Sequence, residues 1–480
     1  MKLSEVLYET GAVYSPEDGD IEIRGITNDS RKVKEGYLFV AVRGYASDGH
    51  SYIGKAIEKG AAAVLCEKAP EAHGVFAVAE NSRAAEAVAA ANFYGRPADR
   101  IKMIGVTGTN GKTTVTNLIK CVIEECTGAK VGLIGTNRNM IGSEERPAER
   151  TTPDSIELTE LLSEMADAGC EYCVMEVSSH ALFLDRVKAI TFEVGAFTNL
   201  TEDHLDFHKT MEAYAEAKSR LFDLCRHAVI NLDDDYTGFM LERADCPVFT
   251  FSTVRDDAGL TAKDIRLKPD GILFRCLAGL EIITVKLGIP GMFSVYNALA
   301  AMSVAIVLGI DAKAAATALS HCKGVMGRAE VVETGRDFTV IIDYAHTPDA
   351  LSNILRTVRG FAKGRVVLLF GCGGDRDRDK RPIMGTIAGR LADYVYVTSD
   401  NPRTERPMDI INQITAGMKN TRAAYEVIEN RREAIAAAVR SAQPGDVVIL
   451  AGKGHETYQI IGTEKRHFDE REVLREILGE

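Results

Sequence analysis

The sequence lacks a secretory leader and any apolar run long enough to cross a membrane. Its first residues, MKLSEVLYETGAVYSPEDGD, do not combine a basic start with an apolar stretch. No apolar run approaches the roughly 20 residues that a membrane-spanning helix needs. We therefore expect a cytoplasmic protein with no membrane span.

An excess of positive charge is also absent. The formal net charge is -12 at pH 7. A chain of this charge does not attract nucleic acid or anionic lipid nonspecifically, so any anionic ligand must be bound by local basic clusters. We expect no nucleic-acid partner, and our working expectation for the oligomeric state is a monomer.

Paired cysteine motifs are missing as well. Of the ten cysteines, only Cys170 and Cys173 have Cys-x-x-Cys spacing, and Cys173 stands in an apolar stretch that predicts a buried strand. A structural zinc site of this kind requires a second pair. We expect free, reduced thiols.

The composition is that of a globular protein with several domains. Hydrophobic residues make up 46% of the chain and charged residues 26%, with no internal repeat or low-complexity tract. At about 100–200 residues per domain, 480 residues predict two to four domains, and we expect three. The expected domains are 1–98, 99–328 and 329–480.

Each expected domain has an α/β pattern. In the first, apolar stretches predict short strands at 36–42, 61–67 and 75–80. An Ala-rich stretch predicts a helix at 82–94. In the second, a strand, a Gly-rich loop and a helix that ends at Gly128 follow Ile101, and the next buried strand is expected at 171–177.

The sequence pattern of the third domain predicts a Rossmann-like, doubly wound sheet. Four apolar strands alternate with Ala-rich helices, at 338–343, 365–370, 394–398 and 446–450. Such alternation predicts parallel strands, and ligands then bind at their carboxyl ends.

The strongest chemical signal is GVTGTNGKTT, residues 105–114. It follows an expected strand and opens an expected helix, as a phosphate-binding loop does. Backbone N–H groups would cradle phosphate oxygens, Lys112 would neutralise their charge, and Thr113 could bind magnesium. Val106 replaces the first glycine of the strict pattern. The loop predicts nucleotide binding, and by itself it could serve a motor, a kinase, a switch or a ligase.

The string TGTNGKTT resembles the Mur ligases and the related folylpolyglutamate synthetases. Further motifs follow in Mur ligase order from about residue 20 to 475, and they include an N-terminal nucleotide-sugar segment that folylpolyglutamate synthetases lack. The resemblance implies an ATP-dependent amide-bond-forming ligase with ATP and Mg²⁺ as cofactors. It implies that meso-diaminopimelate is joined to the D-glutamate side-chain carboxylate of UDP-N-acetylmuramoyl-L-alanyl-D-glutamate, through an acyl phosphate.

The resemblance also implies nucleotide and metal residues. The expected catalytic residues are Lys112, Glu176, His204 and Lys218. Metal binding is implied for Thr113, Glu176, His204 and a carbamylated Lys218. ATP binding is implied for Gly108, Thr109, Asn110, Gly111, Lys112, Thr113, Thr114, Asn297, Arg328 and Asp343, with His346 in the same segment as Asp343.

Pattern alone supports one of these assignments, the metal role of His204, whereas on pattern alone Lys218 would be a solvated helical lysine. Asp203, His204, Asp206 and His208 fall within six residues beside the phosphate loop, a density of ligands that favours a second magnesium site. A lysine whose pKa is lowered by burial or by nearby cations can add carbon dioxide, and the carbamate formed carries negative charge.

Two more binding sets follow from the resemblance. Contacts to the UDP-sugar peptide are implied for Ser30, Tyr45, Ala46, Ser47, Thr151, Thr152, Ser178 and Arg186. Contacts to the incoming amino acid are implied for Arg376, Asp400, Asn401, Pro402, Arg403, Gly452 and Glu456. The string DNPR, 400–403, is the form associated with meso-diaminopimelate rather than L-lysine.

Three alternatives remain at this stage. The same ligase could use L-lysine, or the chain could lengthen folate with glutamate. A noncatalytic or switch-like nucleotide-binding module needs only the phosphate loop, but it does not explain three polar strand ends in the third domain.

Overall fold

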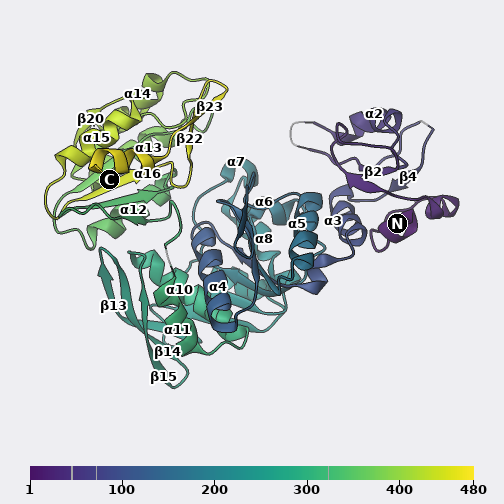
Figure 1. Ribbon diagram of the computed structural model, residues 1–480, viewed down its shortest axis with the longest axis horizontal. Helices are drawn as coiled ribbons and strands as arrows, with labels where there is room; N and C mark the ends of the chain where they lie inside the picture. Colours follow the sequence, from purple (N-terminus) through teal and green to yellow (C-terminus); the bar gives the residue numbers. More distant parts are fainter. Residues whose placement is uncertain (45–46, 72, 323, 480) are drawn as a thin grey trace.

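The computed structural model describes residues 1–44, 47–71, 73–322 and 324–479. The chain forms three lobes in sequence order, with the N-terminal and C-terminal lobes on opposite sides of the central one (Figure 1). Each lobe has its own β-sheet. Among the described residues, no helix has the length and apolar character needed to cross a membrane.

The N-terminal lobe is a parallel four-stranded sheet with helices around it. Its core joins the sheet to α3, and Ile156 of the central lobe packs against that core. The elements are α1 Leu3–Val6, β1 Gly25–Thr27, β2 Tyr37–Val40, α2 Ile53–Glu58, β3 Ala63–Cys66, β4 Phe76–Val78 and α3 Ser82–Phe93.

The central lobe is built on an eleven-stranded sheet, order β15-β14-β13-β12-β11-β10-β5-β9-β6-β7-β8. From β13 through β12, β11, β10, β5 and β9 to β6, neighbouring strands pair in parallel. At the two edges, β13–β14–β15 and β6–β7–β8 pair antiparallel. The strands are β5 Lys102–Thr107, β6 Val131–Ile134, β7 Asn139–Ile141, β8 Glu144–Arg146, β9 Tyr172–Glu176, β10 Phe192–Phe197, β11 Ala228–Asn231, β12 Val248–Ser252, β13 Leu260–Lys268, β14 Gly271–Ala278 and β15 Glu281–Leu287.

Helices cover this sheet, and α10 and α11 pack against α4, the helix that follows the phosphate loop. Buried aliphatic side chains of α4, such as Val115, Leu118 and Val122, join the main core. The helices are α4 Lys112–Thr127, α5 Ser155–Asp167, α6 Ser179–Phe183, α7 Leu205–His208, α8 Met211–Ser219, α9 Thr237–Arg243, α10 Met292–Val307 and α11 Ala312–His321.

The C-terminal lobe is a six-stranded sheet, order β16-β17-β21-β18-β19-β20, parallel except for β16. A separate hairpin, β22–β23, follows β21. The elements are β16 Glu330–Val332, β17 Thr339–Asp343, α12 Pro348–Arg359, β18 Val366–Phe370, α13 Lys380–Leu391, β19 Tyr394–Val397, α14 Pro407–Met418, β20 Ala424–Val427, α15 Arg431–Ser441, β21 Val447–Ala451, β22 Tyr458–Ile461, β23 Glu464–His467 and α16 Glu470–Leu478.

The predicted three-domain α/β class with parallel sheets is confirmed. The four C-terminal strands and α3 lie within one or two residues of their expected positions. The expected domain boundaries after residues 98 and 328 fall between consecutive sheets, and the division itself stays a prediction. One expectation was wrong: the next strand after the phosphate-loop helix is β6, not the strand at 171–177.

The expectation that all thiols are free was also wrong. Cys121 of α4 and Cys322, directly after α11, form a disulfide between residues 201 positions apart. Spacing in the sequence could not reveal this pair, because packing of α11 on α4 brings the two residues together. The Cys170 and Cys173 thiols are free and buried, and burial raises the pKa of Cys170.

Candidate active site

The phosphate loop connects β5 to α4 with two glycines that no other residue could replace without strain. Gly108 has φ +146°, and a Cβ there would lie 1.9 Å from Thr198 Oγ1. Gly111 has φ +87°, and its Cβ would lie 2.6 Å from Asn297 Oδ1. Only glycine adopts such angles freely and permits such close approach. The glycines therefore place Thr198 and Asn297 directly against the loop.

The remaining loop residues are fixed by hydrogen bonds to their surroundings. The Lys112 ammonium donates to the carbonyls of Gly108 and Thr109, at 2.8 and 2.9 Å. Burial lowers the pKa of Lys112. Asn110 Nδ2 donates to Asp349 Oδ2 at 2.9 Å, and Asp349 belongs to α12 of the C-terminal lobe. The phosphate loop thus contacts both lobes.

A cavity of about 770 Å³ opens over this loop, between the central and C-terminal lobes. Its lining combines the polar residues of the phosphate loop with apolar side chains that include Phe251, Phe293 and Ile354. Nearly all the residues expected to bind ATP line it: Thr109, Asn110, Gly111, Lys112, Thr113, Thr114, Asn297, Arg328 and Asp343. Thr151, Glu176, His204 and His346 line it as well.

Arg328 lies in the connection between the two lobes, and Asp343 ends β17 of the C-terminal lobe. Arg328 Nη2 donates to Thr113 Oγ1 at 3.3 Å, and its guanidinium lies 4.8 Å from the centre of the Tyr344 ring. Asp343 accepts hydrogen bonds from the backbone N–H groups of Ala329 and Ala345, at 2.7 and 2.8 Å. In this structure Asp343 thus orients the chain around Arg328.

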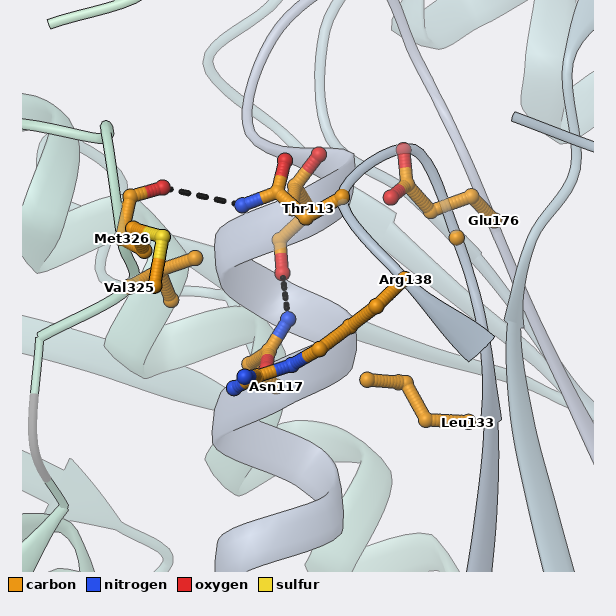
Figure 2. Close-up of a pocket in the computed structure, with 9 residues that line it drawn as sticks. Thr113, Asn117, Leu133, Arg138, Glu176, Val325 and Met326 are labelled. Carbon is orange, nitrogen blue, oxygen red and sulfur yellow. Dashed lines mark hydrogen bonds between the residues drawn. The ribbon is translucent and has the colours of Figure 1, made fainter. Parts of the chain in front are cut away.

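Figure 2 shows a small pocket beside this connection, lined in part by Val325 and Met326. Thr113 and Asn117 lie on one face of α4, with Glu176 across from them and Met326 on the other side. Asn137 Nδ2 donates to the Met326 carbonyl at 2.9 Å. The loop after β6 is therefore tied to the segment that carries Arg328.

Glu176, at the end of β9, is the centre of a hydrogen-bond network. Its carboxylate accepts from Thr136 N at 2.8 Å and from Thr136 Oγ1 at 3.0 Å. Thr136 Oγ1 lies 3.0 Å from Thr151 Oγ1, and Thr152 Oγ1 donates to the Glu176 carbonyl at 2.8 Å. Sequence reasoning missed Thr136, which no motif marks.

Four of the residues expected to contact the UDP-sugar peptide share this network: Thr151, Thr152, Ser178 and Arg186. Arg186 Nη1 donates to the Thr152 carbonyl at 3.0 Å, and the Ser178 N–H donates to Thr152 Oγ1 at 3.1 Å. Ser178 also caps α6. Ser30 and Ser47 lie in the N-terminal lobe, in loops after β1 and β2, and Tyr45 and Ala46 lie outside the described residues.

The expected magnesium cluster at 203–208 is not assembled as the sequence suggested. His204 precedes α7 with φ +55° and makes no side-chain hydrogen bond to the helix, and its Nε2 is 3.5 Å from Asp203 Oδ2. His208 instead shares a 2.9 Å hydrogen bond with Ser179 Oγ and stacks on Tyr214. Among the described residues, no group of three or more His, Cys, Asp or Glu side chains could hold a metal ion.

Lys218 is a buried lysine against the phosphate loop, rather than a solvated one. It is 1% exposed, its Nζ donates to the Gly108 carbonyl at 2.7 Å, and it lies over the Tyr214 ring. Burial lowers its pKa well below the usual value, and the charge of Lys112 lowers it further. The neutral amine that carbamylation requires is therefore favoured at this position.

The residues expected to contact the incoming amino acid gather at the carboxyl ends of β18, β19 and β21. Arg403 Nη1 donates to the Gly374 carbonyl at 2.8 Å, and Asn401 Nδ2 donates to Glu456 Oε2 at 2.8 Å. Gly452 has φ +113°, and a Cβ there would lie 2.6 Å from Asp400 Oδ2. Pro402 is buried and Arg376 is exposed in the facing loop.

Two buried cations in this region were not predicted. Arg381 is fully buried and forms a bidentate pair with Glu405, at 2.8 and 3.0 Å. Lys453 is fully buried beside Asp400, Asn401 and Glu456. Both residues lie within polar motifs of the sequence, GCGGDRDRDKRP and AGKGHETYQ. These motifs were the only sequence feature that could have indicated a role for the two cations.

Comparison with known proteins relates all three lobes to one family. Residues 22–107 match the model of the Mur ligase family catalytic domain, 106–305 that of the Mur ligase middle domain, and 327–454 that of the Mur ligase glutamate ligase domain.

Full-length relatives agree. The chain is 50% identical over 464 residues, 96% of both chains, to a Caldanaerobacter subterraneus subsp. tengcongensis protein named UDP-N-acetylmuramoyl-L-alanyl-D-glutamate--2,6-diaminopimelate ligase. It is 47% identical, over 100% of both chains, to a Clostridium tetani protein of the same name. A solved structure with that name is 32% identical, with a TM-score of 0.73 over 100% of this chain and 99% of its own. The chain belongs to the Mur ligase family.

Proposed function

We propose that this chain joins meso-diaminopimelate to the D-glutamate side-chain carboxylate of UDP-N-acetylmuramoyl-L-alanyl-D-glutamate, using ATP. The observation that carries the proposal is the 770 Å³ cavity, because its walls include the phosphate loop, Glu176 and Arg328. The names of the full-length relatives state the same acceptor and amino acid.

The chemical problem is that a carboxylate is a poor electrophile at neutral pH. Transfer of the ATP γ-phosphoryl group to the carboxylate forms an acyl phosphate and releases ADP. The amine of the incoming amino acid then attacks the acyl carbon, the C–O bond to phosphate breaks, and the ammonium proton is lost. Lys112 stabilises charge on the phosphoryl group during transfer, by position and electrostatics.

Oxygen-bearing residues that line the cavity fit a magnesium ion held largely by nucleotide phosphates. Thr113 and Glu176 offer hard oxygen donors and line the same cavity, which suits a cation that takes few protein ligands. Magnesium would supply charge stabilisation for the phosphoryl group. His204 and a carbamate on Lys218 would serve a second ion, and the burial of Lys218 supports that assignment.

The acceptor and the amino acid would approach from opposite lobes. Thr151, Thr152, Ser178 and Arg186 border Glu176 on the side of the N-terminal lobe, where Ser30 and Ser47 would contact the UDP-sugar part. Arg376, Arg403 and the carboxylates of Asp400 and Glu456 would bind the amino acid in the C-terminal lobe. Arg403 favours meso-diaminopimelate, since L-lysine has no distal carboxylate.

Phosphate release tests the proposal. The protein is incubated with ATP, magnesium and the UDP-muramoyl dipeptide, with and without meso-diaminopimelate. Release is expected only when all substrates are present, together with the tripeptide product. Release with L-lysine alone would establish the other amino-acid specificity, and release with a folate and glutamate would establish the folate activity. Release without any acceptor would indicate a nucleotide-binding module.

A further inference from the structure

Lys453 is a fully buried cation at the end of β21. Its exposed fraction is 0%, and it follows Gly452 directly. A lysine is almost never buried completely unless a partner compensates its charge. The partners of Lys453 therefore indicate what this residue does.

The partners come from two strand-end loops. Lys453 Nζ lies 3.2 Å from Asn401 Oδ1, 3.3 Å from Glu456 Oε2 and 3.5 Å from Asp400 Oδ1. Asn401 Nδ2 donates to the same Glu456 oxygen at 2.8 Å. One ammonium thus connects the loop after β19 to the loop after β21.

The charges of this cluster do not balance. Asp400 and Glu456 carry two negative charges when ionised, and Lys453 supplies one positive charge. One negative charge remains for a cationic ligand, and the ammonium of an amino acid has the required chemistry. Burial without a nearby cation shifts a carboxyl group toward its protonated form, which cannot bind that ammonium as an ion pair.

We propose that Lys453 is a positioning residue that holds the carboxylates of Asp400 and Glu456 in place and compensates their charge for the ammonium of the incoming amino acid. The inference rests on the proposed function, in which these carboxylates contact that substrate. Because Lys453 is fully buried against these side chains, its charge would act on the amino acid through them.

Ionisation of Glu456 depends on its surroundings. Burial raises the pKa of Glu456, Asp400 raises it further, and Lys453 with Asn401 lowers it. Tyr344 after β17, Tyr458 of β22 and Arg403 also face this region. Without Lys453, Glu456 shifts toward its protonated form, because burial and the neighbouring Asp400 both raise its pKa.

The kinetic test compares Lys453→Met with Lys465→Met. Lys465 also lies over the Tyr458 ring, but it is exposed on the hairpin β22–β23. Lys453→Met is expected to raise KM for meso-diaminopimelate about tenfold or more, with KM for ATP and for the UDP-dipeptide unchanged. The acid limb of its kcat/KM profile should move up by about one pH unit. Lys465→Met should match the wild type, and Lys453→Arg should restore most of the profile.

A second measurement does not depend on ligase activity. In Lys453→Met the unpaired carboxylate has a raised folded-state pKa, so its cost is small near pH 4.5 and grows as pH rises toward 8. The Tm deficit relative to wild type is therefore expected to increase with pH. A wild type without ligase activity would defeat the proposed function, whereas this Tm comparison would still test the charge role of Lys453.

Several results would overturn the inference. One is an unchanged KM for meso-diaminopimelate in a folded Lys453→Met protein. Another is a Tm deficit of Lys453→Met that is equal at pH 5 and pH 8. Where Lys453→Met does not fold, Lys453→Met/Glu456→Gln is compared with Glu456→Gln. Glu456→Gln removes one of the carboxylates that Lys453 compensates. Adding Lys453→Met to it should therefore raise KM for meso-diaminopimelate by much less than tenfold, and a full tenfold rise would count against the proposal.

Discussion

Replacing Arg403 with alanine is expected to remove most of the preference for meso-diaminopimelate over L-lysine. One edge of the Arg403 guanidinium is held, because Nη1 donates to the Gly374 carbonyl at 2.8 Å. The planar fork leaves further N–H donors, which match a carboxylate in a bidentate pair. L-Lysine has no carboxylate at that position, so only meso-diaminopimelate gains from the pair.

The size of the effect follows from two charge-assisted hydrogen bonds. Each contributes about 1.5–3 kcal/mol, and the lower end applies because Arg403 is only half-buried. Their loss then costs about 3 kcal/mol in the transition state, or about 150-fold in kcat/KM. Loss of the bond to Gly374 costs about 1 kcal/mol of folding stability, so the variant should remain folded.

The assay measures kcat/KM for both amino acids in the wild type, Arg403→Ala and Arg403→Lys. The alanine variant should lose about 150-fold with meso-diaminopimelate and little with L-lysine. The lysine variant controls for charge and should recover only part of the loss, since it lacks the fork. An unchanged ratio between the amino acids, or a wild type that prefers L-lysine, would refute the reasoning.

Three further substitutions are informative. Lys112→Ala should lower kcat by about 100-fold or more with an unchanged Tm, because one charge-stabilising contact in phosphoryl transfer contributes about 3 kcal/mol, and near-normal phosphate release would contradict this. Lys218→Ala should be nearly inactive, with partial rescue by formate or acetate, and full activity without either would exclude a role for the carbamate. Arg381→Met should lose about 3–5 kcal/mol of unfolding free energy at pH 7. Hydrogen bonding to Arg381 holds the pKa of Glu405 down at about 2, so this stabilisation is present above about pH 4.3 and is lost as pH falls. Urea denaturation should therefore show a smaller difference at pH 3, and equal differences would argue against the ion pair.

Local patterns in the sequence predicted the elements that carry the nucleotide site. The strand, loop and helix at 102–127 combine buried apolar spacing with glycines that the phosphate loop requires, and each of these signals lies within a few adjacent residues. The same holds for β17, β18, β19 and β21, which are continuous apolar runs. The polar residues after these strands meet because parallel strands end at one edge of a sheet.

What the sequence did not predict depends on contacts between distant segments. His204 and His208 are four residues apart, but His204 has a left-handed backbone and His208 turns toward Ser179. The disulfide of Cys121 with Cys322 needs the packing of α11 on α4. The sequence around Lys453 is typical of an exposed loop lysine. In the structure Lys453 is buried against the loop that carries Asp400, which is distant in the sequence.

Transfer of oxygen-18 tests the central claim most directly. The UDP-muramoyl dipeptide is labelled with oxygen-18 in the D-glutamate side-chain carboxylate and incubated with ATP, magnesium and meso-diaminopimelate in unlabelled water. An acyl phosphate intermediate leaves one carboxylate oxygen on phosphorus, so each phosphate released with the tripeptide should carry a single labelled oxygen. Unlabelled phosphate would mean that ATP is hydrolysed by water, and it would contradict the assignment of this cavity to amide-bond formation.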